Sequence, residues 1–462
     1  MPVHVDAVVV GLGPGGEEVA GRLADAGVDV VGVDRHLVGG ECPYWGCIPS
    51  KIMVRAADLV AEGHRIPGMA GTAMVRAEWH PVARNVREAT ADWDDTAAVD
   101  RLTSRGCRVL RGTARLTGRD EVTVRAPDGQ ETVLQAGRAI VLATGTEPAP
   151  PPIPGLDGTP YWTNRDAVAA ERLPRSLIVL GGGAIGLELG QAFARFGTDV
   201  TVVESAPRLL PQEEPEAGEL LARVLSDEGV QVRTGARAAL VVHDGNGFTL
   251  SGERGERLDA ERLLVATGRR TDLAGLGVVN IGVDPDARAL PVDERMRVLT
   301  ASDSAPGVWA LGDITGKGAF THMAVYQAGI VVNGILRHGG AVAAYHAVPR
   351  VTFTDPEVGA VGLTEEQARE RGLAVRVGLA DVARSSRGYI HRAGNQGLVK
   401  VVVDDREGVL VGATSVGPWG GEVLGALTVA VHARVPVDEL HRTIWAFPTF
   451  HRAIGDALRD AG

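Results

Sequence analysis

The amino-acid sequence predicts an α/β fold, with two Rossmann-like domains followed by a C-terminal α+β domain. Two strand–helix–strand segments, each with a glycine-rich turn, are the first observation. The second is a proline-rich segment between them, and the third is a change toward valine- and threonine-rich strands after about residue 345. At 462 residues the chain has room for about three domains of roughly 150 residues each.

The first strand–helix–strand segment begins near the N-terminus. The apolar run Val5–Val10 is typical of a buried parallel strand and leads into the turn Gly11–Gly16. A helical pattern continues to Ala26, and a second apolar strand, Val28–Val33, ends at Asp34. Glycines in such a turn let the backbone approach a pyrophosphate at the helix N-terminus, and the acid accepts hydrogen bonds from a ribose. The segment therefore predicts a dinucleotide-binding site.

The same pattern recurs later in the chain. The strand Leu177–Leu180 precedes the turn Gly181–Gly186, a helix runs to about Phe196, and the strand Val200–Val203 ends at Glu204. The spacing from first glycine to acid is the same in both copies, since 34 − 11 = 23 and 204 − 181 = 23. One such motif is a weak signal, but two in the same register indicate a second dinucleotide-binding domain.

Breaks in the pattern predict the domain boundaries. The linker Pro148–Gly155 contains five prolines, which stiffen a crossing between domains. An Ala-Thr-Gly at Ala143–Gly145 recurs within Ala266–Arg270, where we expect the return crossing. The strand Val308–Asp313 and a helix from about Thr321 follow, and two helices are expected after the strands of the last domain. The expected domains are residues 1–150, 151–270, 271–344 and 345–462, of which the first and third form two parts of one domain.

Composition excludes several functional classes. The chain carries 58 acidic and 47 basic residues, a net charge of −11, which argues against a nucleic-acid or anionic-membrane surface. No apolar run reaches the roughly 20 residues that span a bilayer. The N-terminus enters a strand directly and offers no basic signal region. With only three cysteines, these features predict a cytoplasmic protein.

Two of the cysteines, Cys42 and Cys47, lie in the loop Gly39–Lys51. A disulfide requires Cα atoms within roughly 4.4–6.8 Å, so the backbone must fold back at a distorted helix start, with Pro43 suited to the first helical position. A structural disulfide or half of a zinc site are the alternatives. Closing so short a loop contributes little stability, and no second Cys/His pair is visible, so we favour a reversible redox pair and predict no metal site.

Together these motifs resemble the FAD-dependent pyridine nucleotide-disulfide oxidoreductases across essentially the whole chain. The two glycine turns and the Ala-Thr-Gly at 143–145 carry the resemblance, with the GCIPSK run at 46–51, the Gly-Asp at 312–313 and the segment 353–365. The resemblance implies FAD in the first domain, a nicotinamide cofactor in the second and homodimerisation through the third. The cofactor-binding residues are then expected to be Gly11, Gly13, Gly16, Asp34, Gly40, Lys51, Thr144, Gly145, Gly181, Gly183, Gly186, Glu204, Gly268, Gly312, Asp313, Thr321 and Ala324.

The resemblance also implies roles for the reacting groups. Cys42 is expected to meet the substrate, Cys47 to lie against the flavin, and Lys51 and Glu188 to form an ion pair beside the flavin N5 atom. The helix that begins near Thr321 is expected to direct its N-terminal amides at the flavin C2 carbonyl. A carboxylate at position 204 binds ribose hydroxyls and repels a 2′-phosphate, which favours NADH over NADPH, although Arg208 lies nearby.

The chain departs from the family where a catalytic histidine and its glutamate partner are usual. Phe447 and Arg452 occupy those positions, and His451 stands next to the second of them. General acid–base help is typically worth about 10²–10⁴-fold, so the difference bears on mechanism. Three readings stay open: His451 substitutes as the base, the pocket excludes protons as in 2-ketopropyl-coenzyme M oxidoreductase/carboxylase, or the acceptor is a metal or electron acceptor as in mercuric reductases.

We therefore expect an enzyme that resembles the dihydrolipoamide dehydrogenases and passes electrons from NADH through FAD and the cysteine pair to an unidentified small-molecule acceptor. A diaphorase or redox sensor that has lost the histidine pair is the further alternative. The intercysteine residues Tyr44 and Trp45 also differ from the usual family pattern, and packing is the simpler expectation for both.

Overall fold

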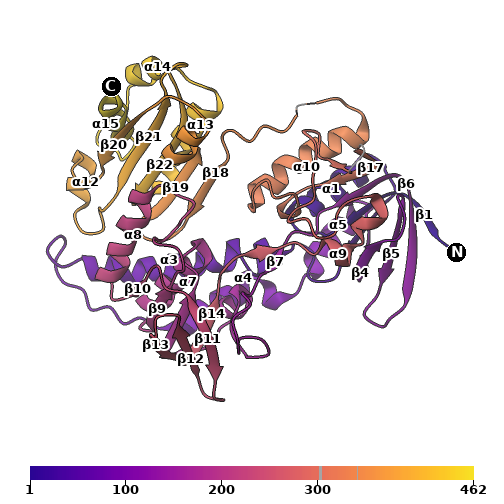
Figure 1. Cartoon of the computed structure of the whole chain (residues 1–462), viewed down its shortest axis with the longest axis horizontal. Coiled ribbons are helices and arrows are strands. Elements are labelled where there is room, and N and C mark those ends of the chain that lie inside the picture. Colours follow the sequence, from indigo (N-terminus) through magenta and orange to yellow (C-terminus); the bar gives the residue numbers. More distant parts are fainter. Residues whose placement is uncertain (301–303, 341) are drawn as a thin grey trace. The chain divides into compact units, whose positions relative to one another are not determined.

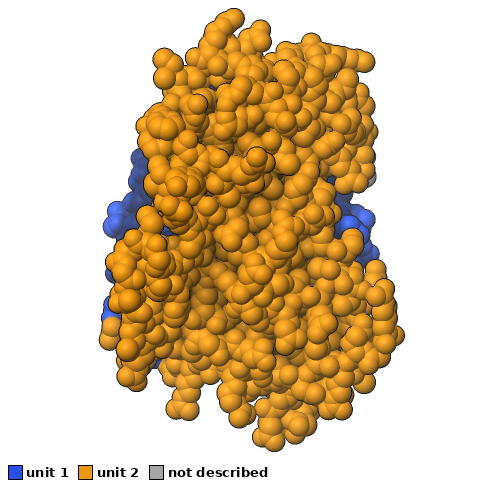
Figure 2. Space-filling view, turned by 90° about the vertical axis from the view of Figure 1, so that its left-hand side faces the viewer, with its two compact units in different colours: residues 1–49, 87–149, 269–345 blue, residues 50–86, 150–268, 346–462 orange. Residues whose placement is uncertain are grey.

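The computed structural model describes residues 1–300, 304–340 and 342–462, and these residues form two compact units (Figures 1 and 2). Unit 1 consists of Met1–Pro49, Arg87–Ala149 and Arg269–Tyr345. Unit 2 consists of Ser50–Val86, Pro150–Gly268 and His346–Gly462. Each unit is therefore assembled from three separate stretches of chain.

Unit 1 is built on a mainly parallel sheet. Its parallel strands lie in the order β3-β2-β1-β6-β17, and β16 pairs antiparallel with β17 at one edge. The sheet strands are β1 (Val3–Val10), β2 (Val30–Asp34), β3 (Arg108–Arg111), β4 (Thr113–Leu116), β5 (Glu121–Arg125), β6 (Glu131–Leu142), β16 (Arg297–Leu299) and β17 (Ser304–Ala310). The unit also contains α1 (Pro14–Asp25), α2 (Glu41–Tyr44), η1 (Ala91–Trp93), α5 (Thr96–Ser104), β7 (Glu147–Pro148), β15 (Arg269–Arg270), α9 (Leu273–Leu276), η2 (Val278–Ile281), η3 (Asp313–Thr315) and α10 (Thr321–Leu336).

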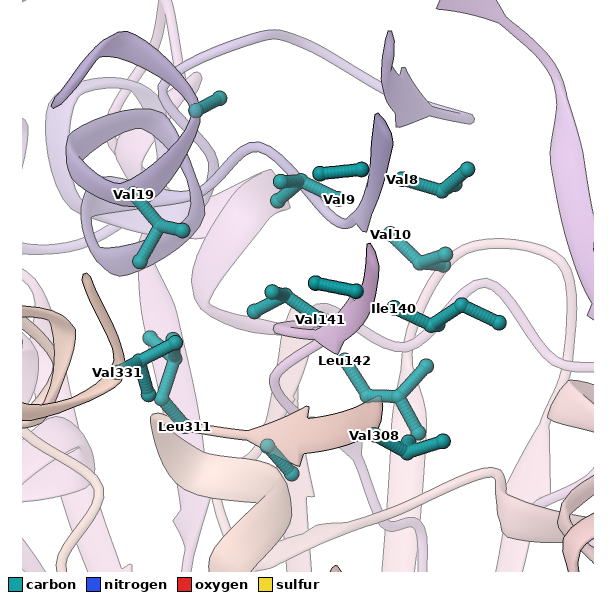
Figure 3. Close-up of a cluster of buried hydrophobic side chains, with 14 of the residues drawn as sticks. Val8, Val9, Val10, Val19, Ile140, Val141, Leu142, Val308, Leu311 and Val331 are labelled. Carbon is teal, nitrogen blue, oxygen red and sulfur yellow. The ribbon is translucent and has the colours of Figure 1, made fainter. Parts of the chain in front are cut away.

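The core of unit 1 explains why its strands read as unbroken apolar runs. In Figure 3, Val9 and Val141 point to the side of the sheet that carries Val19 and Val331, which belong to α1 and α10. Neighbouring residues such as Ile140 point to the other side, and they are buried as well. Successive side chains alternate between the faces of a strand, so a sheet covered on both faces needs apolar residues at every position. Each fully buried valine contributes about 1.5–3 kcal/mol.

Unit 2 contains a second parallel sheet with the order β10-β9-β8-β14. The order repeats β3-β2-β1-β6 of unit 1, so the two glycine-turn segments form equivalent central strands in both sheets. The strands are β8 (Ser176–Leu180), β9 (Asp199–Val203), β10 (Gln231–Arg233) and β14 (Arg262–Val265), with an antiparallel sheet of β11 (Ala238–His243), β12 (Phe248–Gly252) and β13 (Arg257–Ala260). The helices are α6 (Asn164–Val168), α7 (Ala184–Arg195) and α8 (Pro215–Asp227), together with α3 (Cys47–Arg65) and α4 (Trp79–Ala89), which extend across the unit boundaries.

The C-terminal part of unit 2 is an antiparallel sheet covered by helices. The strand order is β18-β19-β22-β21-β20, with bounds Pro349–Thr352, Glu357–Gly362, Val409–Gly417, Leu398–Asp404 and Val375–Asp381. The helices are α11 (Glu365–Glu370), α12 (Ser386–His391), α13 (Gly420–His432), α14 (Val437–Arg442) and α15 (Arg452–Ala461).

Three helices, not the two that the sequence predicts, follow β22. Arg434 adopts a left-handed conformation with φ at 50°, and Pro436 follows it, so α13 cannot continue into α14. None of the helices in the described ranges combines the length and apolarity that a membrane crossing requires.

Candidate active site

The first glycine turn packs the end of β1 against the end of β6. Gly11 has φ at +92°, and a side chain there would collide with the carbonyl of Ala143. Gly13 is the N-cap of α1, which has no side-chain cap, and the nearest atom to a Cβ there would be Gly40 Cα at 4.0 Å. The turn therefore leaves open space before uncapped helix amides, which fits the pyrophosphate of a dinucleotide.

The second turn repeats this arrangement in unit 2. Gly181 has φ at +116°, and a side chain there would collide with the carbonyl of Ala266. Gly183 is the N-cap of α7, again without a side-chain cap, and a Cβ there would meet nothing within 4 Å. In both copies, the third glycine of the motif (Gly16 or Gly186) packs directly on the carbonyl of the first. The predicted residues Gly145 and Gly268 also have positive φ and open space beside them, and each follows the alanine that packs on its turn.

The two acids hold their turns in the same way. The Asp34 carboxylate accepts the N–H of Leu12 at 2.7 Å and that of His36 at 2.7 Å. The Glu204 carboxylate accepts the N–H of Gly182 at 2.7 Å and that of Ala206 at 2.6 Å. An ionised carboxylate has about four acceptor sites, so each acid retains capacity for ribose hydroxyls.

Asp313 is the first residue of η3. It is held in place by residues that lie outside the predicted site. Thr146 Oγ1 donates to Asp313 Oδ2 at 3.0 Å, and Arg269 donates to both the hydroxyl and the carbonyl of Thr146 at 2.8 and 2.6 Å. Burial raises the pKa of the Asp313 carboxyl. The N–H of Gly312 donates to Gln327 Oε1 at 2.7 Å, which ties this turn to α10. A buried carboxyl on such a scaffold suits a ligand hydroxyl group.

The cysteine loop folds back as the sequence predicts, but with a different helix start. Cys42 lies in the short helix α2, where Pro43 is the third residue and not the first as predicted. The N–H of Trp45 bonds to the carbonyl of Glu41 at 2.8 Å, and a Cβ on Gly46 would lie 3.9 Å from Cys42 Cα. The chain therefore doubles back on α2 before α3 begins at Cys47, because Gly46 permits the close approach.

The Cys47 side chain contacts the N-terminus of α10, a helix from a distant part of the chain. Its Sγ atom is 3.3 Å from Oγ1 of Thr321, the first residue of α10. The N-cap residue Phe320 provides no side-chain cap to this helix. The partial positive charge of a helix N-terminus favours a thiolate, and a hydroxyl adds a donor to it. The amide of Ala324 donates to the Phe320 carbonyl at 3.2 Å, so this predicted cofactor contact is engaged within the helix.

In unit 2, Lys51 and Glu188 form the expected ion pair. Lys51 Nζ lies 2.6 Å from Glu188 Oε2, and the Lys51 ammonium lies 4.6 Å from the ring centroid of Phe353. The second carboxylate oxygen, Oε1, accepts the N–H of Phe353 at 2.8 Å. The three residues form a closed triangle in which Glu188 is buried and Lys51 remains about one-third exposed.

A polar ladder continues from this pair along α3 and α7. On each helix the polar residues are spaced so that they lie on one face. They are Lys51, Asp58 and Arg65 on α3 and Glu188, Gln191 and Arg195 on α7. Arg195 binds Asp58 at 2.7 Å and Asp355 at 2.7 Å, and Gln191 exchanges two hydrogen bonds of 2.8 Å with the backbone of Asp355. Burial raises the pKa of Asp58 to about 6. Burial also acts on Asp355, but the Arg195 and Arg65 charges outweigh it and lower the pKa of that carboxyl.

Comparisons with known proteins agree with this geometry. The family described as "Pyridine nucleotide-disulphide oxidoreductase" matches residues 5–328, and the dimerisation domain of that family matches residues 348–458. The chain belongs to the pyridine nucleotide-disulphide oxidoreductases. It is therefore an FAD-dependent oxidoreductase that acts on sulfur groups with a pyridine nucleotide, and its two Rossmann-like domains and C-terminal α+β domain are those of this family.

The similar proteins are named for different substrates. A dihydrolipoyl dehydrogenase of Chlorobaculum tepidum is 34% identical over 100% of this chain and 98% of its own. A mercuric reductase of Streptomyces lividans is 32% identical over 97% and 94% of the two chains. The Cu(II) complex of the HOCl-induced flavoprotein disulfide reductase RclA from Escherichia coli is similar in structure, with a TM-score of 0.86, 27% identity and coverage of 99% of both chains.

The segment where the sequence analysis expects a departure from the family pattern, residues 447–452, leads into the last helix of this pyridine nucleotide-disulphide oxidoreductase. Phe450 is buried and packs on Trp419 and His391, with ring centroids 5.8 and 5.7 Å away. Phe447 is 67% exposed, and the Arg452 guanidinium lies 5.5 Å from its ring centroid. His451 is the N-cap of α15 and half-buried. In the residues that the structure describes, no group of three or more His, Cys, Asp or Glu side chains could hold a metal ion.

Proposed function

We propose that this oxidoreductase takes electrons from NADH and delivers them through FAD and the Cys42–Cys47 pair to an external acceptor, in the manner of dihydrolipoamide dehydrogenases. The observation that carries the proposal is the 3.3 Å contact between Cys47 Sγ and Thr321 Oγ1 at the start of α10. It places the second cysteine of a CxxxxC pair where a helix N-terminus stabilises a thiolate. A buried structural cysteine would not need such surroundings.

FAD is proposed to bind unit 1 through the open turn at Gly11, Gly13 and Gly16, with Asp34 on the adenosine ribose and Asp313 on the ribityl hydroxyls. The uncapped amides of α1 and the residual acceptor capacity of Asp34 fit this group. Gly40 supports the same turn, because a Cβ there would come within 2.7 Å of Gly13 Cα. When bound, the flavin accepts two electrons from a nicotinamide and can pass them to a neighbouring disulfide. The proposed cofactor residues Thr144 and Gly145 follow the end of β6, and Gly312 follows the end of β17, which pairs with β6.

The cysteines are proposed to divide the work of disulfide reduction. The reduced pair carries two electrons and, before ionisation, two protons. The Cys42 thiolate attacks the acceptor disulfide, which forms a mixed disulfide and releases one acceptor thiolate. The Cys47 thiolate then attacks the Cys42 sulfur, which releases the second acceptor thiolate and restores the Cys42–Cys47 bond. The two released thiolates take up from solvent the two protons that the cysteine pair lost on ionisation. Thr321 stabilises the Cys47 thiolate, and Lys51 with Glu188 is proposed to favour negative charge on the reduced flavin ring.

The nicotinamide is proposed to be NADH. Gly181, Gly183 and Gly186 form its pyrophosphate turn, and Glu204 faces its ribose. Arg208, which could soften repulsion of a 2′-phosphate, donates instead to the carbonyls of Pro211 and Glu213 at 2.8 and 3.0 Å. A carboxylate held by backbone amides, with the neighbouring guanidinium bound to its own loop, disfavours the extra phosphate of NADPH.

The acceptor is proposed to be a small disulfide whose reduction does not use a family-type histidine. Phe447 cannot transfer a proton, and His451, at the head of α15, is not proposed as its substitute. A metal ion is the second candidate acceptor, because similar proteins include mercuric reductases and a copper complex of RclA. The 462 residues contain no cysteine after Cys107, so they supply no second cysteine pair for mercury. A proton-excluding carbon–sulfur cleavage remains the alternative reading of Phe447.

The enzyme is proposed to be a cytoplasmic homodimer formed through its dimerisation domain. Large apolar side chains are exposed on this domain, among them Ile444 at 97% and Val429 at 65%. A dimer formed through the domain that the family model names would cover side chains of this kind. Light scattering on purified protein should give about twice the chain mass of 48.3 kDa, and the Ile444→Asp variant should shift it toward one chain mass.

Anaerobic titration of the FAD-loaded protein with NADH tests the proposed function. A long-wavelength absorbance band from a thiolate beside oxidised flavin is expected after one equivalent, and the Cys47→Ser variant should lose it. Bleaching of the flavin without this band would show a diaphorase and overturn the proposed role of the cysteine pair. NADH oxidation with lipoamide, oxidised glutathione, Cu(II) and Hg(II) then ranks the acceptors.

A further inference from the structure

A short strap in unit 1 adopts a conformation that its residues do not favour. Ala91, Asp92 and Trp93 have φ angles of 50°, 54° and 59°, so three successive non-glycine residues are left-handed. A left-handed conformation is unfavourable for a residue with a side chain and persists only where the surroundings hold it. The contacts that this strap, residues 91–95, makes should therefore indicate why the conformation is retained.

Three contacts join the strap to the chain that leads into and through α2. The Trp93 indole stacks on the indole of Trp45, with ring centroids 5.3 Å apart and planes inclined by 21°. The Trp93 Nε1–H donates to the carbonyl of Tyr44 at 3.2 Å. Farther along, Asp95 Oδ2 accepts the N–H of Val38 at 2.6 Å.

Residues on both sides of these contacts, Tyr44 next to the cysteine loop and Asp95 in the strap, are themselves held in place. Tyr44 is itself buried, so the carbonyl that accepts the indole N–H belongs to a fixed residue. Asp95 is in turn held by Arg111 at 2.6 Å. The strap is thus fixed at one end to β3 and presses its indole on Trp45, which lies two residues before Cys47 and three after Cys42.

We propose that Trp93 is a positioning residue for the redox pair: it clamps the intercysteine loop so that the two sulfurs stay close after the disulfide is reduced. The inference rests on the proposed redox role of Cys42 and Cys47. A loop with fewer accessible conformations raises the effective concentration of one thiol near the other, which favours the disulfide. Removing the clamp should therefore make the disulfide easier to reduce.

The measurement is the thiol–disulfide equilibrium of the FAD-loaded protein in buffers of reduced and oxidised dithiothreitol. Reduced dithiothreitol gives two electrons and two protons and closes its own cyclic disulfide, while the Cys42–Cys47 bond opens into two thiols. After an acid quench and alkylation, mass spectrometry of the peptide that carries Cys42 and Cys47 gives the reduced fraction. NADH is not needed, so the result does not depend on turnover.

The expected result is a graded change. Trp93→Ala should lower the dithiothreitol ratio at half-reduction about tenfold, a rise of about 30 mV in reduction potential. Trp93→Phe keeps a stacking ring but loses the N–H donor, and it should shift the ratio about threefold. Trp79→Phe is the matched control. The Trp79 indole also donates to a carbonyl, that of Ala170 at 2.8 Å, and it also stacks on an aromatic ring, that of Phe193, but all three residues belong to unit 2. This control variant should leave the dithiothreitol ratio at half-reduction unchanged.

The outcomes separate this inference from the proposed function. If Trp93→Phe and Trp93→Ala bind FAD normally and keep the wild-type ratio within twofold, or if the disulfide becomes harder to reduce, the clamp is wrong while the cysteine chemistry stands. If Trp79→Phe shifts the ratio as much as Trp93→Phe, the effect is general destabilisation and the clamp is again wrong. If the wild-type cysteines show no reversible reduction at any ratio, the proposed function itself fails.

Discussion

Cys47 Sγ lies 3.3 Å from Thr321 Oγ1, although 274 residues separate the two in the chain. Cys47 opens α3 and Thr321 opens α10, so a reactive sulfur meets the start of a second helix. The hydroxyl can donate to a thiolate, and the helix N-terminus adds favourable partial charge. The residues of the cysteine loop alone do not predict that Cys47 contacts Thr321.

Replacing Thr321 by valine should weaken the thiolate of the reduced enzyme. A hydrogen bond to a charged group is worth about 1.5–3 kcal/mol, so the equilibrium constant for ionisation of the Cys47 thiol should fall by at least about tenfold. The long-wavelength absorbance band after anaerobic NADH titration measures it. Thr321→Ser keeps the hydroxyl and should retain most of the band, whereas equal bands in the valine variant and wild type would show that the hydroxyl does not contribute.

The hydrogen bonds that Glu188 accepts should contribute more to the free energy of unfolding than its negative charge does. Glu188→Ala leaves the Lys51 ammonium and the Phe353 N–H without this acceptor and should cost about 2–3 kcal/mol, at the lower end for a buried pair because Lys51 is partly exposed. Glu188→Gln can still accept the Phe353 N–H and should cost about half as much. Thermal unfolding followed by circular dichroism measures the difference, and equal losses in the two variants would contradict it.

The choice of nicotinamide should depend on Glu204. We expect kcat/KM for NADH to exceed that for NADPH by at least about 10², since a phosphate beside a fixed carboxylate is repelled and unpaired. Glu204→Ala should narrow this ratio mainly by weakening NADH binding, seen as a higher KM. Arg208→Ala is the control and should leave the ratio nearly unchanged, because its guanidinium is bound to carbonyls of its own loop.

Phe447→His should introduce a missing acid–base group. The side chain at 447 is largely exposed, so an imidazole fits there without repacking the core. Turnover with lipoamide should rise about tenfold, the lower range of general acid–base gains, and further in Phe447→His with Arg452→Glu, which adds an orienting carboxylate. Steady-state assays with NADH measure this rise.

His451 provides the counter-test to this prediction. His451→Ala should change turnover less than twofold in the wild-type background. A loss of about 10²-fold or more would instead identify His451 as the base and remove the reason to introduce one at position 447.

Asp58 should make stability depend on pH. Burial raises the pKa of this carboxyl from 3.8 to about 6 in the folded state, so the folded protein binds the proton more tightly than the unfolded chain. The stability from the protonated form is present below about pH 4 and is lost as pH rises through 6. The Tm of wild type minus that of Asp58→Asn should therefore fall between pH 4.5 and pH 7 in scanning calorimetry.

An exposed aspartate gives a control of opposite sign. The Thr96 hydroxyl lowers the pKa of Asp94, so Asp94 contributes stability at higher pH that is lost on acidification. The Tm of wild type minus that of Asp94→Asn should thus stay nearly constant between pH 4.5 and pH 7 and fall only as the pH drops below about 3.8. A pH-independent difference for Asp58→Asn would contradict the raised pKa.

The sequence alone determined the local architecture of both nucleotide turns. Gly11 and Gly181 were predicted as turn residues, and both adopt positive φ against a neighbouring carbonyl. The acids at 34 and 204, placed by equal spacing, make the same two backbone hydrogen bonds in each unit. The positions of the glycines and the acids are predictable because their spacing follows from the geometry of one strand–turn–helix–strand unit. The carbonyls of Ala143 and Ala266 that the two glycines meet come from distant strands.

The tertiary structure decided which side chains support the chemistry. Thr146, Arg269 and Gln327, which hold the turn at Asp313, carry no sequence signal, and neither does the packing of Trp93 on Trp45. The position of Pro43 in α2 and the number of terminal helices were also predicted wrongly, the latter because of the local break at Arg434 and Pro436. Pairings between distant segments depend on strand order and on how side chains fill the space between elements, and neither is encoded in any short stretch of the chain.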